Sequence, residues 1–181
     1  MPDLPDVLNP PTDPVATTEV IAATKVWLER AVIGLNLCPF AKAVHVKQQI
    51  RYAVTAAQTA DELLAELEHE LQLLADTAPD ILDTTLLIHP KVMGDFLDFH
   101  FFQAEAKAAI KNLGFAGVFQ IASLHPQYEF AGSDPDDIDN FSNRAPYPTL
   151  HLLREASIDR AVAAFPDAAE IFERNIETLQ G

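Results

Sequence analysis

QIASLHP, residues 120–126, decides the fold class, together with a matching stretch, TTLLIHP, residues 84–90. Each is a short run of branched or small apolar residues that ends on a histidine followed by a proline. Runs of this length and composition are typical of strands buried in a sheet. The two stretches therefore predict buried strands that end at His89 and His125.

Amphipathic helices are predicted between these strands. Residues 60–76 place leucines on one face and acidic side chains on the other, and Thr59 stands where a helix N-cap is expected. Further helices are expected over residues 16–38, 39–45, 95–114, 157–165 and 167–180, and further strands over 46–55 and 149–156, the latter as a strand or a strand that runs into a helix. Alternating strands and helices indicate a single α/β domain over residues 16–181, with about four strands in a mixed, partly parallel sheet covered by amphipathic helices. Residues 1–15 are acidic and proline-rich, and we expect them to form a flexible arm.

Composition narrows the classes of partner. The 181 residues carry 27 acidic and 12 basic side chains, a formal net charge of -15, and the basic residues form no cluster. Nucleic acids and anionic membranes are therefore not expected as partners, because both are bound through basic faces. The only cysteine is Cys38, so no intramolecular disulfide can form and a cytoplasmic location is expected. The sequence identifies no cofactor and leaves homo-oligomerisation open.

The two histidines point to a site. If the first three strands are joined by helical crossovers, their carboxyl ends meet at one edge of the sheet, where open α/β sheets usually bind ligands. His89 and His125 then lie at that edge, as acid/base groups, metal ligands or hydrogen-bond donors. The alternative is that each imidazole is satisfied by a backbone carbonyl at the end of its strand.

Cys38 is a candidate nucleophile. It precedes Pro39, which suits the first position of a helix. A thiol at a helix N-cap lies near free backbone N–H groups, which favour the thiolate. The alternative is a small buried side chain that only packs.

A long polar segment, residues 127–148, separates the last two strands. Its aromatic side chains favour an ordered loop folded over the sheet edge. In and after it lie the candidate binding residues Tyr128, Asn143, Arg144 and Arg154 and a further candidate catalytic residue, His151. Arginine suits carboxylate or phosphate binding. Metal sites formed by His89, His125 and His151, or by the aspartates at 134, 136, 137 and 139, are weaker alternatives.

Four stretches in order resemble the DUF1415 family of bacterial proteins of unknown function: GLNLCPFAK at 34–42, TTLLIHP at 84–90, QIASLHPQYEFAG at 120–132 and NRAPYPTLHLLREASI at 143–158. The resemblance covers nearly the whole chain from Trp27 onward. It implies no established activity. The stretches that carry it contain Cys38, His125, Asn143, Arg144, His151 and Arg154.

The leading hypothesis is a small enzyme or binding protein for an anionic metabolite. Cys38, His125 and His151 would be catalytic, and His89, Tyr128, Asn143, Arg144 and Arg154 would bind the ligand. One alternative is a non-enzymatic protein-interaction or oligomerisation module, in which the aromatic loop and acidic surface form an interface. The other is a metal-dependent, hydrolase-like protein with histidine and aspartate ligands.

Overall fold

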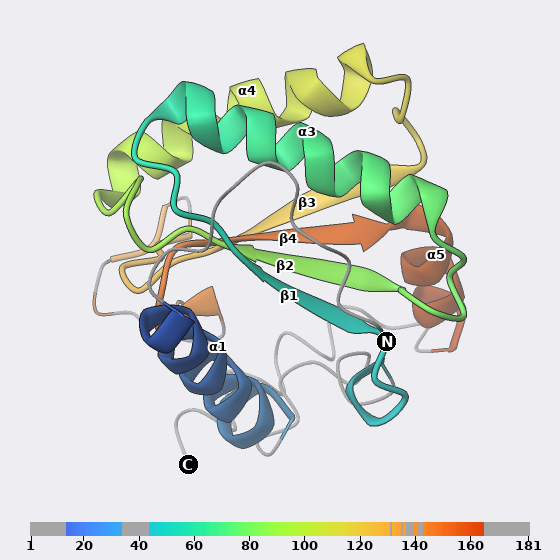
Figure 1. The fold of residues 1–181 in the computed structure, drawn as a ribbon, viewed down its shortest axis with the longest axis horizontal. Coiled ribbons are helices and arrows are strands. Elements are labelled where there is room, and N and C mark those ends of the chain that lie inside the picture. The colour runs from blue at the N-terminus through green and yellow to red at the C-terminus, as the bar shows by residue number, and fades with distance from the viewer. Residues whose placement is uncertain are drawn as a thin grey trace.

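A four-stranded mixed sheet forms the centre of the molecule (Figure 1). The computed structural model describes residues 14–33, 44–130, 132–134, 136, 140 and 143–164. The strands are β1 (Ile50–Val54), β2 (Thr84–Ile88), β3 (Phe119–Leu124) and β4 (Thr149–Arg154), in the spatial order β1-β2-β4-β3. β1 and β2 are parallel, and β4 runs antiparallel to both β2 and β3. β1, β2 and β3 therefore point the same way, and their carboxyl ends share one edge of the sheet.

The predicted α/β class and mixed sheet are confirmed, but the sequence did not indicate the position of β4. This strand lies between β2 and β3, so those two consecutive strands are not neighbours. Leu150 and Leu152 of β4 are fully buried. A strand that buries such side chains gains most from a central position, where both of its edges are paired and helices cover it.

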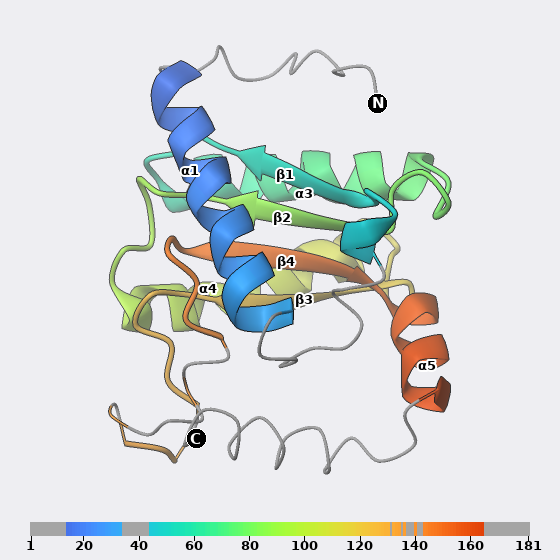
Figure 2. The same cartoon turned by 90° about the horizontal axis from the view of Figure 1, so that it is seen from below.

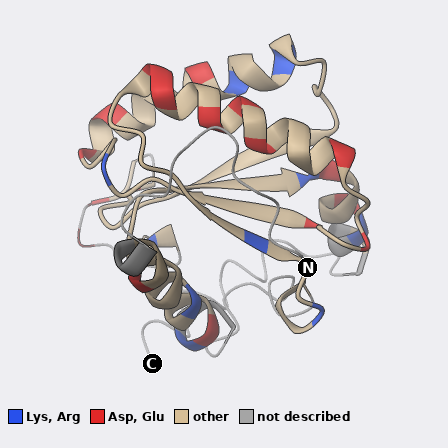
Figure 3. Ribbon diagram, in the orientation of Figure 1, with Lys and Arg blue, Asp and Glu red and all other residues tan. Residues whose placement is uncertain are grey.

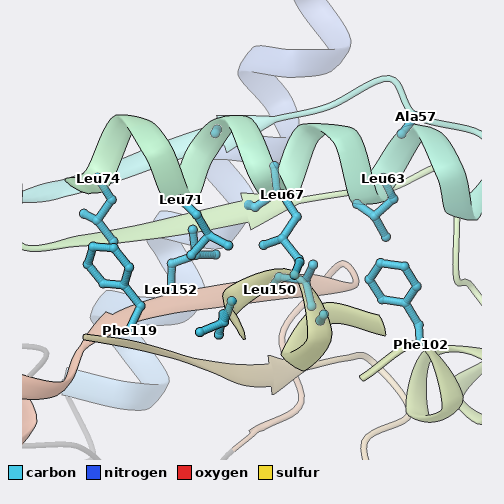
Figure 4. Packing of buried hydrophobic residues seen from close by; sticks show 14 of the residues in the cluster. Ala57, Leu63, Leu67, Leu71, Leu74, Phe102, Phe119, Leu150 and Leu152 are labelled. Atoms are coloured by element: carbon cyan, nitrogen blue, oxygen red, sulfur yellow. The ribbon is translucent and has the colours of Figure 1, made fainter. Parts of the chain in front are cut away.

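Two long helices cover one face of the sheet. α3 (Ala60–Asp76) begins at the predicted cap, where the Thr59 side chain accepts a hydrogen bond from the N–H of Glu62. α4 (Phe96–Asn112) is capped by Asp95 and is followed by Gly114, whose φ of +79° suits a residue without a side chain. Figure 4 shows the leucines of α3 pointing toward Leu150, Leu152 and Phe119 of the sheet.

The opposite face is covered by α1 (Pro14–Trp27), as Figure 2 shows. The helix expected from residue 16 begins two residues earlier, and its backbone becomes a π-helix, η1, over Leu28–Ile33. Val20 of α1 packs with Leu86, Ile88 and Leu124 in a second, smaller apolar cluster. The sheet is therefore buried on both faces in its centre.

Several predicted segments fall partly or wholly outside the described residues. They are residues 1–13 of the arm, the end of the first predicted helix, most of the helix expected over 39–45, and the last helix at 167–180. β4 passes directly into α5 (Glu155–Ala164), the first of the two predicted closing helices. None of the helices in the described ranges is both long and apolar enough to cross a membrane.

Candidate functional site

His89 and His125 lie at the shared carboxyl edge, as the strand pattern predicts. The N–H of His89 donates to the carbonyl of Pro148, and the N–H of His125 donates to the carbonyl of Asn143, both at 3.0 Å. These bonds continue the pairing of β2 and β3 with the segment that leads into β4. Both side chains are buried, with exposed fractions of 0% and 1%.

The ring of Phe99, from α4, packs against both imidazoles. Its ring centroid lies 5.5 Å from that of His89 and 5.3 Å from that of His125. Phe96, one turn earlier, lies 5.4 Å from His125. Even side-chain positions of β2 and β3 face α1 and odd ones face α3 and α4, so both histidines point to the α4 layer. The result is a compact cluster of aromatic rings between the sheet edge and α4.

His89 keeps one ring nitrogen without a hydrogen bond. Its Nδ1 lies 3.0 Å from the carbonyl oxygen of Val92, which can only accept, so Nδ1 carries the proton. Nε2 then holds a lone pair, and it is buried without a partner among the described residues. Burial lowers the pKa of His89 to about 4, against smaller opposing effects from backbone carbonyls. At neutral pH the side chain is an uncharged hydrogen-bond acceptor.

His125, in contrast, uses both ring nitrogens. Nδ1 accepts a hydrogen bond from the N–H of Gln127 at 2.9 Å, and Nε2 donates to the carbonyl of Met93 at 3.0 Å. Met93 has a φ of +60°, a left-handed conformation that is costly for a side chain of this kind. Burial is the main cause that lowers the pKa of His125. This histidine holds the β2–α4 loop in a strained conformation against the end of β3.

Three of the other predicted residues border His125. Tyr128 donates its N–H to the carbonyl of His125, and its ring packs on Phe96 at 5.4 Å. Burial raises the pKa of its phenol. Arg144 donates from Nε to the carbonyl of Tyr128 at 3.0 Å, and Asn143 donates from Nδ2 to the carbonyl of Ser123 at 3.1 Å. The start of the long loop and its end are thus fastened together beside the histidines.

His151 and Arg154 lie elsewhere. His151 pairs in register with Leu86 and Ala122, on the face of the sheet that α1 covers. It retains some exposed surface, yet burial lowers its pKa to about 4. Because His89 and His125 point to the other face, the three histidines do not form the zinc site considered from the sequence. Within the described ranges, no group of three histidine, cysteine or acidic side chains could hold a metal ion.

Arg154 lies at the opposite end of the sheet, because β4 runs antiparallel to its neighbours. Its guanidinium donates to the carbonyls of Leu74, Thr77 and Leu82, at 2.8, 2.8 and 2.7 Å from Nη2. The first two belong to the carboxyl end of α3, where a cation is favoured. Arg154 thus links α3 to β4 and does not join His125.

Sequence reasoning missed two residues that shape this edge. Phe99 gave no signal of its own, because it stands in a phenylalanine-rich helix and only its fully buried position distinguishes it. Asn140 is also fully buried. Its Oδ1 accepts from the N–H of Phe130 and its Nδ2 donates to the carbonyl of Asp134, which orders the described part of the long loop. A polar residue in a polar loop carries no sign of burial.

Tyr52 is a third missed residue, on the α1 face. It lies in the same row across the sheet as Leu86 and His151. Its hydroxyl is buried and has no hydrogen-bond partner among the described residues. Burial, and then the charge of Glu29, raise the pKa of this phenol to about 12. The alternating pattern of β1 predicted the strand but not a buried hydroxyl.

Three predicted residues lie outside the part of the chain that the structure describes. Cys38 lies outside the described residues, and so do Asp137 and Asp139 of the acidic loop. The edge cluster therefore consists of His89 and His125, the rings of Phe96, Phe99 and Tyr128, and the fastening residues Asn143 and Arg144.

Comparison with known proteins gives one result. The model of the family described as "Protein of unknown function (DUF1415)" matches residues 19–181 of the 181-residue chain. No curated protein and no solved structure matches the chain. The matched region includes the whole sheet and every residue of the edge cluster. The chain belongs to the DUF1415 family.

Proposed function

We propose that the protein binds a small anionic metabolite at the carboxyl edge of the sheet, with Nε2 of His89 accepting a hydrogen bond from the ligand. The observation that carries the proposal is the buried Nε2 atom, which finds no partner among the described residues. A buried polar atom without a partner costs about 1–3 kcal/mol, and such atoms are rare in folded proteins. A ligand N–H or O–H group would remove this cost.

The role of His89 follows from its protonation. Its pKa of about 4 reflects a site where a charged imidazole is poorly solvated. Taking a proton from a substrate would create that charge, so His89 is a weak general base at neutral pH. It is well suited to fix the orientation of a hydroxyl or amide group.

The surroundings suggest the rest of the ligand. The rings of Phe96, Phe99 and Tyr128 supply apolar walls, and Arg144 supplies a positive charge beside Tyr128. Apolar walls with a few directed polar groups are typical of small-molecule sites. Phe96 and Tyr128 are only half-buried, whereas His89 is fully buried, so a ligand reaches Nε2 only if side chains of the edge cluster move aside.

An enzymatic form of this proposal needs a group other than His89 for proton or covalent chemistry. We keep Cys38 as its proposed nucleophile, on the sequence alone. Cys38→Ser would then abolish turnover and leave ligand binding intact. Equal turnover by this variant and the natural protein would eliminate the covalent mechanism but not the binding function.

The binding proposal is tested by a thermal-shift screen. The panel consists of carboxylic acids, amino acids, sugar phosphates and nucleotides, each at 5 mM. For a dissociation constant of about 50 µM this concentration is roughly 100 times the dissociation constant, and binding raises the free energy of unfolding by about 2.7 kcal/mol. The variants are His89→Phe, which removes Nε2 and keeps a ring, and His69→Phe, a partly exposed histidine on α3, as the matched control.

The expected result is a rise in Tm for one chemical class in the natural protein and in His69→Phe, and a much smaller rise in His89→Phe. A compound that stabilises all three proteins equally binds elsewhere and contradicts the proposal. A panel without any hit also contradicts the proposal if ¹⁵N NMR of the His89 imidazole shows Nε2 hydrogen-bonded to a trapped water.

A further inference from the structure

The outward face of α4 carries large apolar side chains. Leu97 and Phe101 have exposed fractions of 60% and 68%, although the opposite face of the same helix buries Phe99 and Phe102. Exposed single apolar residues are common, but two on adjacent turns form a patch. Ala104 and Ala108, both exposed, continue the patch toward the end of the helix.

The four residues follow the spacing of a helix–helix seam. Leu97, Phe101, Ala104 and Ala108 are separated by four, three and four positions. This is the alternation of the two core positions in a coiled coil, and it keeps one stripe of a helix facing a partner helix. The alanines allow a partner backbone to approach closely. We call these four residues the α4 stripe.

Charge on the two sides of the α4 stripe indicates what the partner is. One flank of the stripe carries Asp98 and Glu105, each one position after a stripe residue. The other flank carries His100 and Lys107, each one position before a stripe residue. Figure 3 shows that α4 carries both signs of charge, whereas acidic residues dominate α3. A helix with opposite charges on its two flanks is complementary to a parallel copy of itself, because each flank then meets the opposite flank of the partner.

We propose that the protein forms a homodimer through the α4 stripe, with the two copies of α4 parallel and related by a two-fold axis along them. Glu105 of one copy then lies across from His100 of the other. In an antiparallel pair the acidic flanks would face each other, and so would the basic flanks, which the charges disfavour. The stripe covers only three turns, so the interface is small and we expect a weak dimer.

This proposal does not depend on the ligand site. Its first test is sedimentation velocity of the full chain from 1 to 500 µM. The natural protein should shift from monomer to dimer over this range, and Phe101→Ser should stay monomeric. Ile81→Ser is the matched control, because Ile81 is also exposed, at 56%, but does not lie on α4. A monomer at every concentration, or a dimer that Phe101→Ser does not weaken, overturns the proposal.

The parallel arrangement has its own tests. Leu97→Cys in a Cys38→Ser background should form an intermolecular disulfide under mild oxidation, because a parallel pair brings residue 97 of both copies together. An antiparallel pair places these residues about 16 Å apart along the helix, at 1.5 Å per residue, and forms no such bond. Glu105→Lys should weaken the dimer at least fivefold, and adding His100→Glu, at the position across from residue 105, should restore part of the affinity. A stronger dimer in Glu105→Lys would overturn the parallel arrangement.

Discussion

The polar side chains at the two ends of the sheet differ in how completely they are hydrogen-bonded. At the end where β4 finishes, Arg154 donates to three backbone carbonyls and connects α3 with the sheet. At the end where β2 and β3 finish, His125 uses both ring nitrogens, but His89 leaves one unused among the described residues. Arg154 is partly buried and the two histidines are fully buried, and both residue types occur in active sites.

The difference shows why residue type alone does not identify a site. An arginine whose Nε and Nη2 atoms donate to backbone carbonyls contributes to stability by linking the elements that carry those carbonyls. A buried acceptor without a donor adds nothing to stability and is retained where a function uses it or a bound water satisfies it. The contrast predicts that substitutions at the Arg154 end mainly change folding, and that substitution of His89 mainly changes binding.

The largest effect is expected for Arg154→Met. This change leaves the carbonyls of Leu74, Thr77 and Leu82 without their donor and should lower the free energy of unfolding by about 3 kcal/mol. Urea denaturation followed by circular dichroism measures it. The matched control is Arg160→Met, because Arg160 is exposed and makes one side-chain bond, to Ser157, so a loss below about 0.5 kcal/mol is expected. Equal losses in both variants would mean that Arg154 is not a structural link.

A smaller loss, about 2 kcal/mol, is expected for His125→Phe. The new ring keeps the contacts with Phe96 and Phe99, but the N–H of Gln127 and the carbonyl of Met93 lose their partners. The left-handed Met93 then loses a bond that holds it in place, so the β2–α4 loop should loosen. Urea denaturation gives the stability, and hydrogen exchange should show faster exchange at Gln127. Unchanged exchange there would show that His125 does not hold this loop.

Local sequence patterns predicted the elements well, because each element is encoded over a short window. The leucine spacing of α3 and its Thr59 cap determine both of its ends nearly to the residue. The place of β4 in the sheet was not predictable in the same way. It depends on pairing with β2 and β3, which lie far away in the sequence, and on which way β4 runs.

The site was predictable only in part, for the same reason. The ends of two parallel strands placed His89 and His125 at one edge, and the structure bears this out. The antiparallel direction of β4 moved Arg154 to the other edge, and the alternation of side chains moved His151 to the other face. Which nitrogen of His89 is left without a partner depends on the position of a single carbonyl, that of Val92, in a loop.

The smallest effect, and the most specific, is the pH dependence due to His89. Its folded-state pKa of about 4 lies below the unfolded value of 6.5, so the unfolded chain takes up a proton first as pH falls. Protonation of His89 in the unfolded chain therefore leaves the free energy of unfolding unchanged well above pH 6.5 and lowers it progressively between pH 6.5 and 4. From pH 7 to 5.5 the free energy of unfolding falls by about 1 kcal/mol because of this residue.

The variant His89→Phe tests this expectation. Its free energy of unfolding, measured by urea denaturation at both pH values, should fall by about 1 kcal/mol less than that of the natural protein. His125→Phe supplies a comparison at the same edge, since the pKa of His125 is also lowered. If His89→Phe keeps the full pH dependence, His89 is already charged or solvated in the folded protein. Its Nε2 atom would then not be a buried acceptor without a partner, and the contrast between the two ends of the sheet would be wrong.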